Sequence, residues 1–339
     1  MKRWRISCIP TEYVVPALGA LAVLSALLSL CLGAAPLAPG EVLAALTGRG
    51  SGAAASIVLY ARLPRTCGCL LAGAALAASG TVIQGVLENP LAAPNVIGVN
   101  AGAGLCTAVC AALWPAWTAA LPFAAFLGAL GGVGLVTAIG SRAGASRITL
   151  VLAGVAVSGM FSAGIDAVLT FFPDALSGYT DFRVGGVANL SMNRVAPAFW
   201  VALAAFLLAL SLAGEMDVLV LGEETARSLG LPARRLRLIL LALAAALAGA
   251  AVSFAGLLGF VGLIAPHMVR RLAGEDSAAR LLCASALGGA ALLTLCDILA
   301  RTLFAPYELP VGVVLSLLGG PFFLWLLLRQ RRGRGKSRA

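Results

Sequence analysis

A few charged residues lie within or beside long apolar segments, and their side chains could bind another charged group. Arg62 and Arg65 stand just before an uncharged run from Thr66 to Leu87, where we expect a water-facing rim. Asp297 and Arg301 stand four residues apart in a later apolar segment, so a helix would bring them onto one face. An acid in such a segment is costly and usually paired, so we expect Asp297 to pair with Arg301. Arginine can hold a carboxylate through two parallel hydrogen bonds, which is recognition rather than catalysis.

Side chains with catalytic or ligating chemistry are few. His267, the one histidine of the chain, follows Pro266, and we expect it to make a structural hydrogen bond rather than to ligate haem. Ser158 and His267 are notional parts of an intramembrane protease, but the chain has no supported serine–histidine constellation. Asp166 lies in an apolar segment without an obvious partner and is expected to face either a pathway or the packed interior. No metal site is predicted, since the eight cysteines lie mostly in apolar runs.

The composition identifies the solvent of this protein. Hydrophobic residues make up 60% of the 339 residues and charged residues only 11%, which excludes an ordinary water-soluble domain. No stretch resembles a separate soluble domain, so residues 1–339 are expected to form one transmembrane domain in the lipid bilayer. The net charge of +10 does not indicate nucleic-acid binding, because no basic surface with interleaved aromatic residues accompanies it.

Apolar segments of the right length predict an all-α, polytopic membrane protein with about ten transmembrane helices. The first segment could be read as a signal peptide, but more membrane segments follow it, so we interpret it as a retained helix. The eighth is short, and we expect a half-spanning or tilted element that is buried in protein. The expected spans are 14–34, 63–87, 95–113, 117–140, 147–172, 195–214, 235–256, 258–272, 279–303 and 310–328.

Basic residues are distributed unequally between the two sides that these spans define. With the N-terminus inside, the inner segments carry 18 lysines and arginines, and the outer segments carry 6. Short cytoplasmic loops are enriched in such residues. We therefore expect both termini in the cytoplasm and an external connection at residues 36–60.

The stretch 62–104 combines three features that suit the wall of a transport pathway. Two arginines give it a charged start. The run that follows is rich in glycine, alanine and serine, which lets neighbouring helices approach closely, and it holds the polar residue Gln84. Glu88, Asn89 and Pro90 then end the helix, because proline lacks the backbone N–H and disfavours helix at the residue before it.

The longest hydrophilic stretch expected on the inner side is the loop of residues 214–237. Within it, Glu223 and Glu224 open a short amphipathic helix that Gly230 closes, with Pro232 just beyond. A solvated loop that merely joins two spans is the alternative interpretation. The chain lacks a nucleotide-binding sequence of the G-x-x-x-x-G-K-[ST] type, so this polypeptide is not expected to hydrolyse ATP.

Several motifs together resemble the permease subunits of the FecCD-type family, which are parts of ABC importers for ferric siderophores, haem and vitamin B12. The resemblance extends from about Arg62 to Leu328 and is specific in combination. The motifs are Arg62-Leu-Pro-Arg65, the Gly73–Gly80 core, Gln84, Asn89-Pro-Leu-Ala-Ala-Pro94 with Gly98 and Gly102, the segment Gly259–Arg270, Asp297 with Arg301, and Glu308-Leu-Pro-Val-Gly312.

The resemblance implies an inner-membrane permease that translocates an iron–siderophore, haem or corrinoid chelate and performs no covalent chemistry. It implies two ABC ATPase subunits that bind ATP and magnesium, while this chain binds no cofactor. It further implies a second permease copy or a paralogue, and an extracytoplasmic substrate-binding protein that delivers the chelate. The outer loop 173–194 lacks a tryptophan that family members often carry before a Gly-Ser pair, which weakens any assignment of the substrate.

The resemblance also implies roles for individual residues. A coupling helix that sits in a groove of the ATPase is implied at Glu223, Glu224, Ala226, Arg227, Leu229 and Gly230. Docking of acidic residues of the binding protein is implied at Arg62, Arg65 and Arg301, whose alternative role is anchoring at the membrane interface. The translocation path and its inner gate are implied at Gln84, Asn89, Pro90, Leu91, Ala145 and Ser146, where ordinary helix capping is an equally good interpretation.

An ion-coupled secondary transporter is the competing functional class, because such proteins also use broken helices and sites near the middle of the membrane. It would need acids within the membrane that titrate during transport, for which Asp166 and Asp297 are the candidates. Neighbouring reading frames that encode an ATPase and a binding protein would favour the ABC importer.

Overall fold

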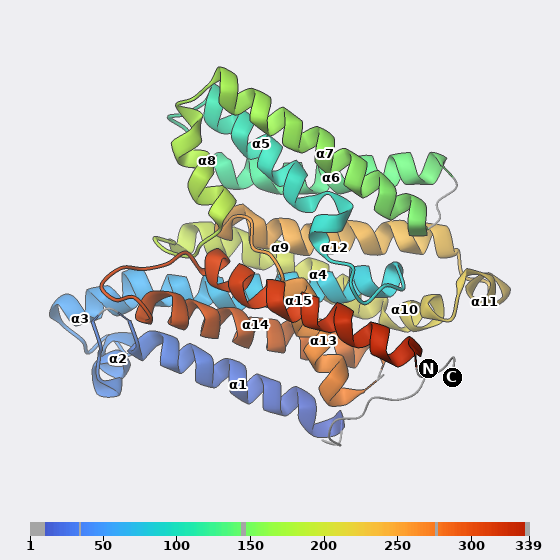
Figure 1. The fold of residues 1–339 in the computed structure, drawn as a ribbon. Coiled ribbons are helices and arrows are strands. Elements are labelled where there is room, and N and C mark those ends of the chain that lie inside the picture. The colour runs from blue at the N-terminus through green and yellow to red at the C-terminus, as the bar shows by residue number, and fades with distance from the viewer. Residues whose placement is uncertain (1–10, 34, 144–146, 275–276, 336–339) are drawn as a thin grey trace.

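The computed structural model of the protein describes residues 11–33, 35–143, 147–274 and 277–335. Within these ranges the chain is helical and contains no β-strand. Its long helices run roughly side by side, so the molecule has two ends (Figure 1). The first long helices are α1 (Thr11–Cys31), α4 (Leu63–Val86), α5 (Val99–Leu113), α6 (Leu121–Arg142) and α7 (Arg147–Phe171). The later ones are α9 (Met192–Ser211), α12 (Ala233–Ala255), α13 (Val261–Ala273), α14 (Ala278–Thr302) and α15 (Val311–Gly335).

Short helices mark the two ends of the bundle. One end, called the α2 end below, carries α2 (Pro39–Leu46), α3 (Gly52–Ser56) and α8 (Ala175–Val184). The opposite end, called the α11 end, carries α10 (Ala213–Val220) and α11 (Glu223–Ser228). Helix α14 begins at the α11 end and finishes at the α2 end, so it connects the two (Figure 1).

Each of the ten expected spans contains a helix, which confirms the all-α, polytopic architecture. Among the described residues, seven helical stretches are long and apolar enough to cross a bilayer. They comprise most of α1, the continuous stretch Gly52–Val86, and the helices α6, α7, α9, α12 and α14. Helix α5 and the segment Val311–Leu326 of α15 are apolar but shorter. A count of ten complete crossings therefore stays a prediction.

Helix α4 lies at the centre of the bundle and contacts α12, α13 and α14. Its small residues allow the partner backbones to come close. An added Cβ at Gly73 would lie 2.2 Å from the carbonyl oxygen of Gly289 in α14. An added Cβ at Gly80 would lie 1.9 Å from the carbonyl oxygen of Gly262 in α13. The small residues of this run thus serve close packing of helix backbones, as the sequence predicts.

The eighth expected span is a half-length helix. Helix α13 has 13 residues, which is about 20 Å at 1.5 Å per residue, against a hydrocarbon core of about 30 Å. The chain reaches it from α12 through the irregular residues 256–260, which are buried or half-buried, and Phe260 has a left-handed φ of 65°. Non-helical backbone is tolerated at this depth when protein covers it. The short element agrees with the sequence-based expectation.

The expected external connection at residues 36–60 holds α2, α3 and most of the π-helix η1 (Ile57–Arg62). Because η1 joins α3 to α4 directly, one helical stretch runs from Gly52 to Val86. Pro64 lies in the first turn of α4, where it removes one backbone hydrogen-bond donor, and the π-helical turn η1 directly precedes it. The helix therefore begins at Gly52 rather than at residue 63, and Arg62 lies well inside it.

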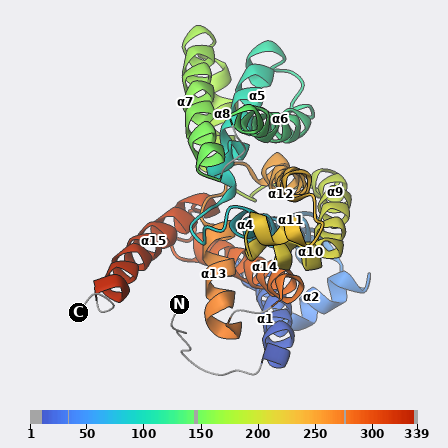
Figure 2. The same cartoon turned by 90° about the vertical axis from the view of Figure 1, so that its right-hand side faces the viewer.

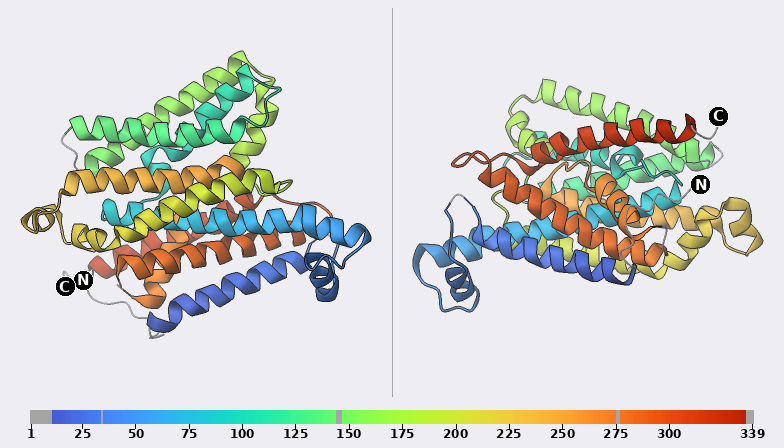
Figure 3. Two further views of the ribbon diagram at one scale, coloured as in Figure 1. Left: turned by 180° about the vertical axis from the view of Figure 1, so that it is seen from behind. Right: turned by 60° about the horizontal axis from the view of Figure 1, so that its bottom comes forward.

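Helices α5, α6, α7 and α8 form a group beside α12, on the side of the bundle away from α1 (Figures 1 and 2). Figure 3 shows from two further sides that α1 lies at the opposite edge of the bundle. The segment 87–98 links α4 to this group and includes the 3-10 helix η2 (Pro94–Ile97). A Cβ at Gly154 of α7 would lie 2.0 Å from the carbonyl oxygen of Val96, so α7 packs directly on η2.

Candidate functional site

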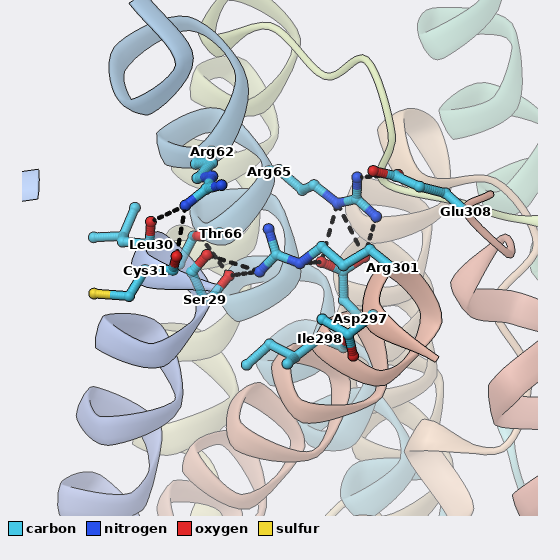
Figure 4. A network of polar contacts seen from close by, with 11 residues as sticks. Ser29, Leu30, Cys31, Arg62, Arg65, Thr66, Asp297, Ile298, Arg301 and Glu308 are labelled. Carbon is cyan, nitrogen blue, oxygen red and sulfur yellow. Dashed lines mark hydrogen bonds and ion pairs between the residues drawn. The ribbon is translucent and has the colours of Figure 1, made fainter. Parts of the chain in front are cut away.

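A network of charged side chains at the α2 end is centred on Asp297 of α14 (Figure 4). The Asp297 carboxylate is fully buried, and Arg65 of α4 donates to it from Nε at 3.0 and 3.1 Å and from Nη2 at 2.9 Å. The remaining nitrogen of Arg65, Nη1, donates to Glu308 at 2.6 Å. The Arg65 side chain is 12% exposed and that of Glu308 is 39% exposed. Arg65 thus joins a buried carboxylate to one at the surface.

Arg301 adds a second guanidinium to this network, one turn after Asp297. Its Nε lies 3.6 Å from Asp297 Oδ2, and its Nη2 donates to the backbone oxygen of Ser29 at 2.8 Å and to its hydroxyl at 2.6 Å. Ser29 of α1 also shares a 2.7 Å hydrogen bond with Thr66 of α4. The predicted pair of Asp297 with Arg301 is confirmed, but Arg65 is the closer partner. The network fastens α1, α4 and α14 to one another.

Arg62 caps helix α1. Its guanidinium donates to the carbonyl oxygens of Leu30 and Cys31, both at 2.8 Å, and also to that of Ala35. Leu30 and Cys31 are the last residues of α1, and the last carbonyls of a helix have no partner within it. Arg62 therefore satisfies backbone groups that would otherwise be left without hydrogen bonds.

Burial corrects one part of the docking hypothesis. The sequence predicts Arg62 and Arg65 at a water-facing rim and Arg301 near the end of a span, but Arg62 is 5% exposed and Arg301 is 2% exposed. Arg62 is covered because it lies inside the stretch Gly52–Val86 and against the end of α1. Of the three arginines, Arg65 comes closest to the surface, at the edge that Glu308 covers. A docking role stays a prediction, and the geometry supports it best for Arg65.

Helix α11 lies where the sequence predicts a short helix in the loop 214–237. It begins at Glu223, and Gly230, with a φ of 81°, follows its end. Within α11, Ala226 is buried against the bundle. Glu224, Arg227, Ser228 and Leu229 are exposed. Because α11 protrudes from its end of the bundle, this surface is available to a second protein (Figure 1).

Glu223 anchors α11 to the bundle. Its carboxylate accepts a 2.7 Å hydrogen bond from Arg227 and a 3.2 Å bond from Arg237 of α12, which is 3% exposed. Partial burial by itself raises the pKa of Glu223, but the hydrogen bonds and charges of Arg237 and Arg227 outweigh it and hold this pKa below its usual value. The Glu223 carboxylate is therefore fully charged at neutral pH. Its stabilising contacts with Arg237 and Arg227 are lost as the pH falls through the lowered pKa.

Two further contacts connect this end to other helices, and the sequence did not predict them. The carboxylate of Asp217 in α10 accepts a 2.8 Å hydrogen bond from the backbone N–H of Ala278, the first residue of α14. Such N–H groups lack a partner within their own helix, so Asp217 caps α14 from outside. Arg234 at the start of α12 donates to the carbonyl oxygen of Ser141 in α6 at 2.8 Å.

The residues that flank the gate candidates meet at the α11 end. Glu88, just after α4, forms an ion pair with Arg147, the first residue of α7. Asn89 and Pro90 beside it are exposed, and the Asn89 side chain accepts a 3.0 Å hydrogen bond from the backbone N–H of Leu91. Asn89 thus makes the turn-capping bond that the alternative interpretation expects, and its role in a gate stays a prediction.

Gln84 lies among helices of this chain, and its role on a translocation path stays a prediction. It is 3% exposed. Its Nε2 donates to the carbonyl oxygen of Gly262 in α13 at 3.2 Å, and its Oε1 accepts from Arg270. The polar side chain fixes the half-length helix α13 against α4. The gate candidates Ala145 and Ser146 lie outside the described residues.

The notional protease residues do not form a reactive pair. Within the described ranges, Ser158 Oγ and His267 Nε2 are each buried without a hydrogen-bond partner, so neither activates the other. The His267 ring stands edge-on to Phe322 of α15, with 5.7 Å between the ring centroids. Asp166, in contrast, is exposed on α7.

Comparisons with known proteins identify the family. Residues 21–329 match the model of the FecCD transport family. The chain is 38% identical over 293 residues to the hemin transport system permease protein HmuU of Yersinia pestis, which covers 82% of this chain and 85% of that protein. It is 37% identical over 319 residues to the Fe(3+)-citrate import system permease protein YfmE of Bacillus subtilis, and the match covers 93% of this chain and 94% of that protein. It is 38% identical over 323 residues to the vitamin B12 import system permease protein BtuC of Citrobacter koseri, with the same coverage of 93% and 94%.

The fold agrees with these sequence relationships. A solved structure, described as an inward-facing conformation of a transporter assigned to the metal-chelate ABC type, superimposes with a TM-score of 0.81 and 28% sequence identity. The similarity covers 94% of this chain and 99% of that chain. The named relatives are transport permeases rather than enzymes. This chain therefore belongs to the FecCD transport family, whose members are permease subunits of ABC importers.

Proposed function

We propose that this permease imports a metal chelate, an iron–siderophore, haem or a corrinoid, in a transporter that ATP drives. The observation that carries the proposal is the presence of two candidate protein-binding surfaces at opposite ends of one bundle. Helix α11 protrudes at one end, and the pair Arg65–Glu308 reaches the surface at the other. Helix α14 connects them, since Asp217 contacts its first residue and Asp297 lies near its last turn. A coupling role of α14 requires that its contacts at both ends change together during transport.

Two ATPase subunits and an extracytoplasmic binding protein are the proposed partners. The exposed surface of the α10–α11 segment mixes the charges of Glu224 and Arg227 with the apolar side chains of Leu221 and Leu229, which are 67% and 63% exposed. Such a mixture suits a protein groove better than open water. ATP and magnesium belong to the ATPase subunits in this proposal. The names of the relatives mention hemin, Fe(3+)-citrate and vitamin B12, which supports a metal chelate as the substrate class.

A second permease copy or a paralogue is proposed to face α7. Gly159, Ser162, Asp166 and Thr170 are exposed and follow one another at intervals of three or four residues, so they share one face of this helix. A carboxylate that faces lipid within a membrane span is costly. We therefore assign this face to a hydrated pathway between two permease subunits rather than to lipid.

The chain is proposed to span the cytoplasmic membrane with the α11 end in the cytoplasm, because the basic residues are concentrated on that side. Ser228 in α11 and Ser177 in α8 are exposed at opposite ends. In a variant without other cysteines, Ser228→Cys should react with a membrane-impermeant maleimide only after the cells are opened. Ser177→Cys should react in intact cells. Labelling of Ser228→Cys in intact cells would reverse the proposed orientation.

Uptake by reconstituted transporter tests the function. In proteoliposomes that contain the permease with its ATPase, uptake of a ferric siderophore, haem or cobalamin should require both ATP and the binding protein. An ion gradient should not replace ATP. The competing secondary transporter predicts the opposite, although one of its two candidate acids, Asp297, is already held by Arg65 and Arg301. Uptake that an ion gradient drives without ATP would refute the importer.

The same assay tests the coupling helix. Replacing Glu224 and Arg227 together with alanine should lower uptake at least tenfold, by loss of either ATPase binding or coupling. The fold should persist, because the pair of Arg227 with Glu223 is exposed and such pairs contribute about 0.3–0.5 kcal/mol. Arg235→Ala, which removes an exposed charge near the same end, is the matched control and should transport normally. Normal ATPase assembly and uptake in the double variant would exclude α11 as the coupling element.

A further inference from the structure

Arg65 has one hydrogen-bonding edge near the surface, and a residue of the same chain already occupies it. Two of its nitrogens, Nε and Nη2, are bound by Asp297, which is fully buried. The third, Nη1, donates to Glu308 at 2.6 Å. With the Arg65 side chain 12% exposed, an incoming carboxylate has to take the place of the Glu308 carboxylate in order to reach this guanidinium (Figure 4).

Glu308 is free to leave this position while the backbone stays in place. Its side chain is 39% exposed and lies in the loop between α14 and α15. The next residue, Leu309, donates from its backbone N–H to the carbonyl oxygen of Ala300 at 3.0 Å, which holds the loop against the end of α14. Rotation of one exposed side chain is therefore enough to uncover the edge of Arg65.

The surface around Glu308 has the composition of a protein interface. Leu303, Phe304 and Tyr307 of the same loop are 64%, 56% and 79% exposed. Aromatic side chains together with arginine are enriched at the centres of protein interfaces. The network itself contains two arginines, Arg65 and Arg301, and two acids, Asp297 and Glu308, so departure of Glu308 leaves it with one net positive charge. A soluble partner that presents a carboxylate between apolar groups matches this surface.

We infer that Glu308 is a built-in competitor for the docking partner. Its carboxylate holds the site of Arg65 that a carboxylate of the binding protein takes on docking, so one ion pair is exchanged for another. This inference rests on the proposed docking role of Arg65. The exchange keeps the buried charges neutralised both before and after docking, and it lowers the affinity of the permease for its partner by the free energy of the Arg65–Glu308 pair.

The competitor role and an ordinary structural role of Glu308 predict effects of opposite sign. If Glu308 competes, its removal exposes Arg65 and tightens docking. If Glu308 instead orients Arg65 for the partner, its removal weakens docking. An exposed or partly exposed pair contributes up to about 1 kcal/mol, so Glu308→Gln should lower the dissociation constant of the binding protein about fivefold.

The test measures that dissociation constant with the complete transporter, permease and ATPase together, in nanodiscs. Asp174→Asn removes another exposed acid from the α2 end and controls for a general change in charge, so it should leave the constant nearly unchanged. Glu308→Asp keeps the charge on a shorter side chain and should fall between the wild type and Glu308→Gln. An unchanged or higher constant for Glu308→Gln would overturn the inference.

Arg65→Lys separates failure of this inference from failure of the docking proposal. Lysine keeps the positive charge beside Asp297 but has no planar fork for a two-point bond, so binding-protein affinity should fall. If Arg65→Lys weakens binding while Glu308→Gln has no effect, docking at Arg65 stands and the competitor role fails. If neither variant changes the dissociation constant, docking at Arg65 fails as well.

Discussion

Replacement of Asp297 by asparagine is expected to remove most of the folded permease from the membrane. Asp297 is fully buried, and the side chains of Arg65 and Arg301 that contact it are only 12% and 3% exposed. Without the carboxylate, two guanidinium groups remain in a buried site with Glu308 as the one remaining acid of the network. Loss of one partner from a buried ion pair costs about 3–5 kcal/mol. That is a large part of the roughly 5–15 kcal/mol by which folded proteins are stable.

The measurement is the yield of monodisperse protein in detergent and its thermal unfolding midpoint. Glu308→Gln is the matched control: it removes an acid from the same network at its exposed side, and its midpoint should stay near that of the wild type. A double variant, Asp297→Asn with Arg301→Gln, leaves one uncompensated arginine fewer and should recover part of the lost stability. An Asp297→Asn protein with wild-type yield and midpoint would mean that the network does not hold these helices together.

Composition and local spacing were sufficient to locate the long apolar helices, because in a membrane these depend on apolar length and on backbone hydrogen bonds within each segment. The short helices α2, α3 and α8 were not predicted. Spacing of four residues also predicted the pair of Asp297 with Arg301. It could not predict Arg65, which lies 232 residues away from Asp297 along the chain and meets it because α4 packs on α14. The contacts of Asp217 with Ala278 and of Glu88 with Arg147 were missed for the same reason.

The expected rim position of Arg62 was wrong for a physical reason that a sequence does not display, and the path role of Gln84 stays a prediction. Arg62 was expected at a rim because the helix was expected to begin beside it, but helix extends back to Gly52 and the end of α1 covers the arginine. Gln84 was expected on a path because it is a polar residue in an apolar run. In a helix buried on most sides, no periodicity distinguishes a polar residue facing a path from one that bonds a neighbouring backbone, as Gln84 does with Gly262.

The role of small residues in α4 leads to a prediction whose sign is unusual. Gly80→Ala should strongly destabilise the permease, although glycine to alanine within a helix normally stabilises it by about 0.5–1 kcal/mol. A Cβ at residue 80 would lie 1.9 Å from the carbonyl oxygen of Gly262 and 2.7 Å from its Cα. The obstacle is backbone, so no side-chain rotation relieves it, and α13 has to move away from α4. The same carbonyl oxygen accepts the hydrogen bond of Gln84, which the movement would break.

The displacement should reach further than this one contact, because α13 is also locked against α15. Phe260, just before α13, packs so closely on Gly319 that an added Cβ there would lie 2.2 Å from the ring. Gly131→Ala in α6 is the matched control, since a Cβ at that position has no neighbour within 4 Å and should leave stability equal or slightly higher. Thermal unfolding midpoints of the two variants should therefore change in opposite directions, and ATP-driven uptake should be lost in Gly80→Ala alone. Equal midpoints for both variants would show that α4 and α13 can separate without cost, and that the half-length helix is not held by backbone contact.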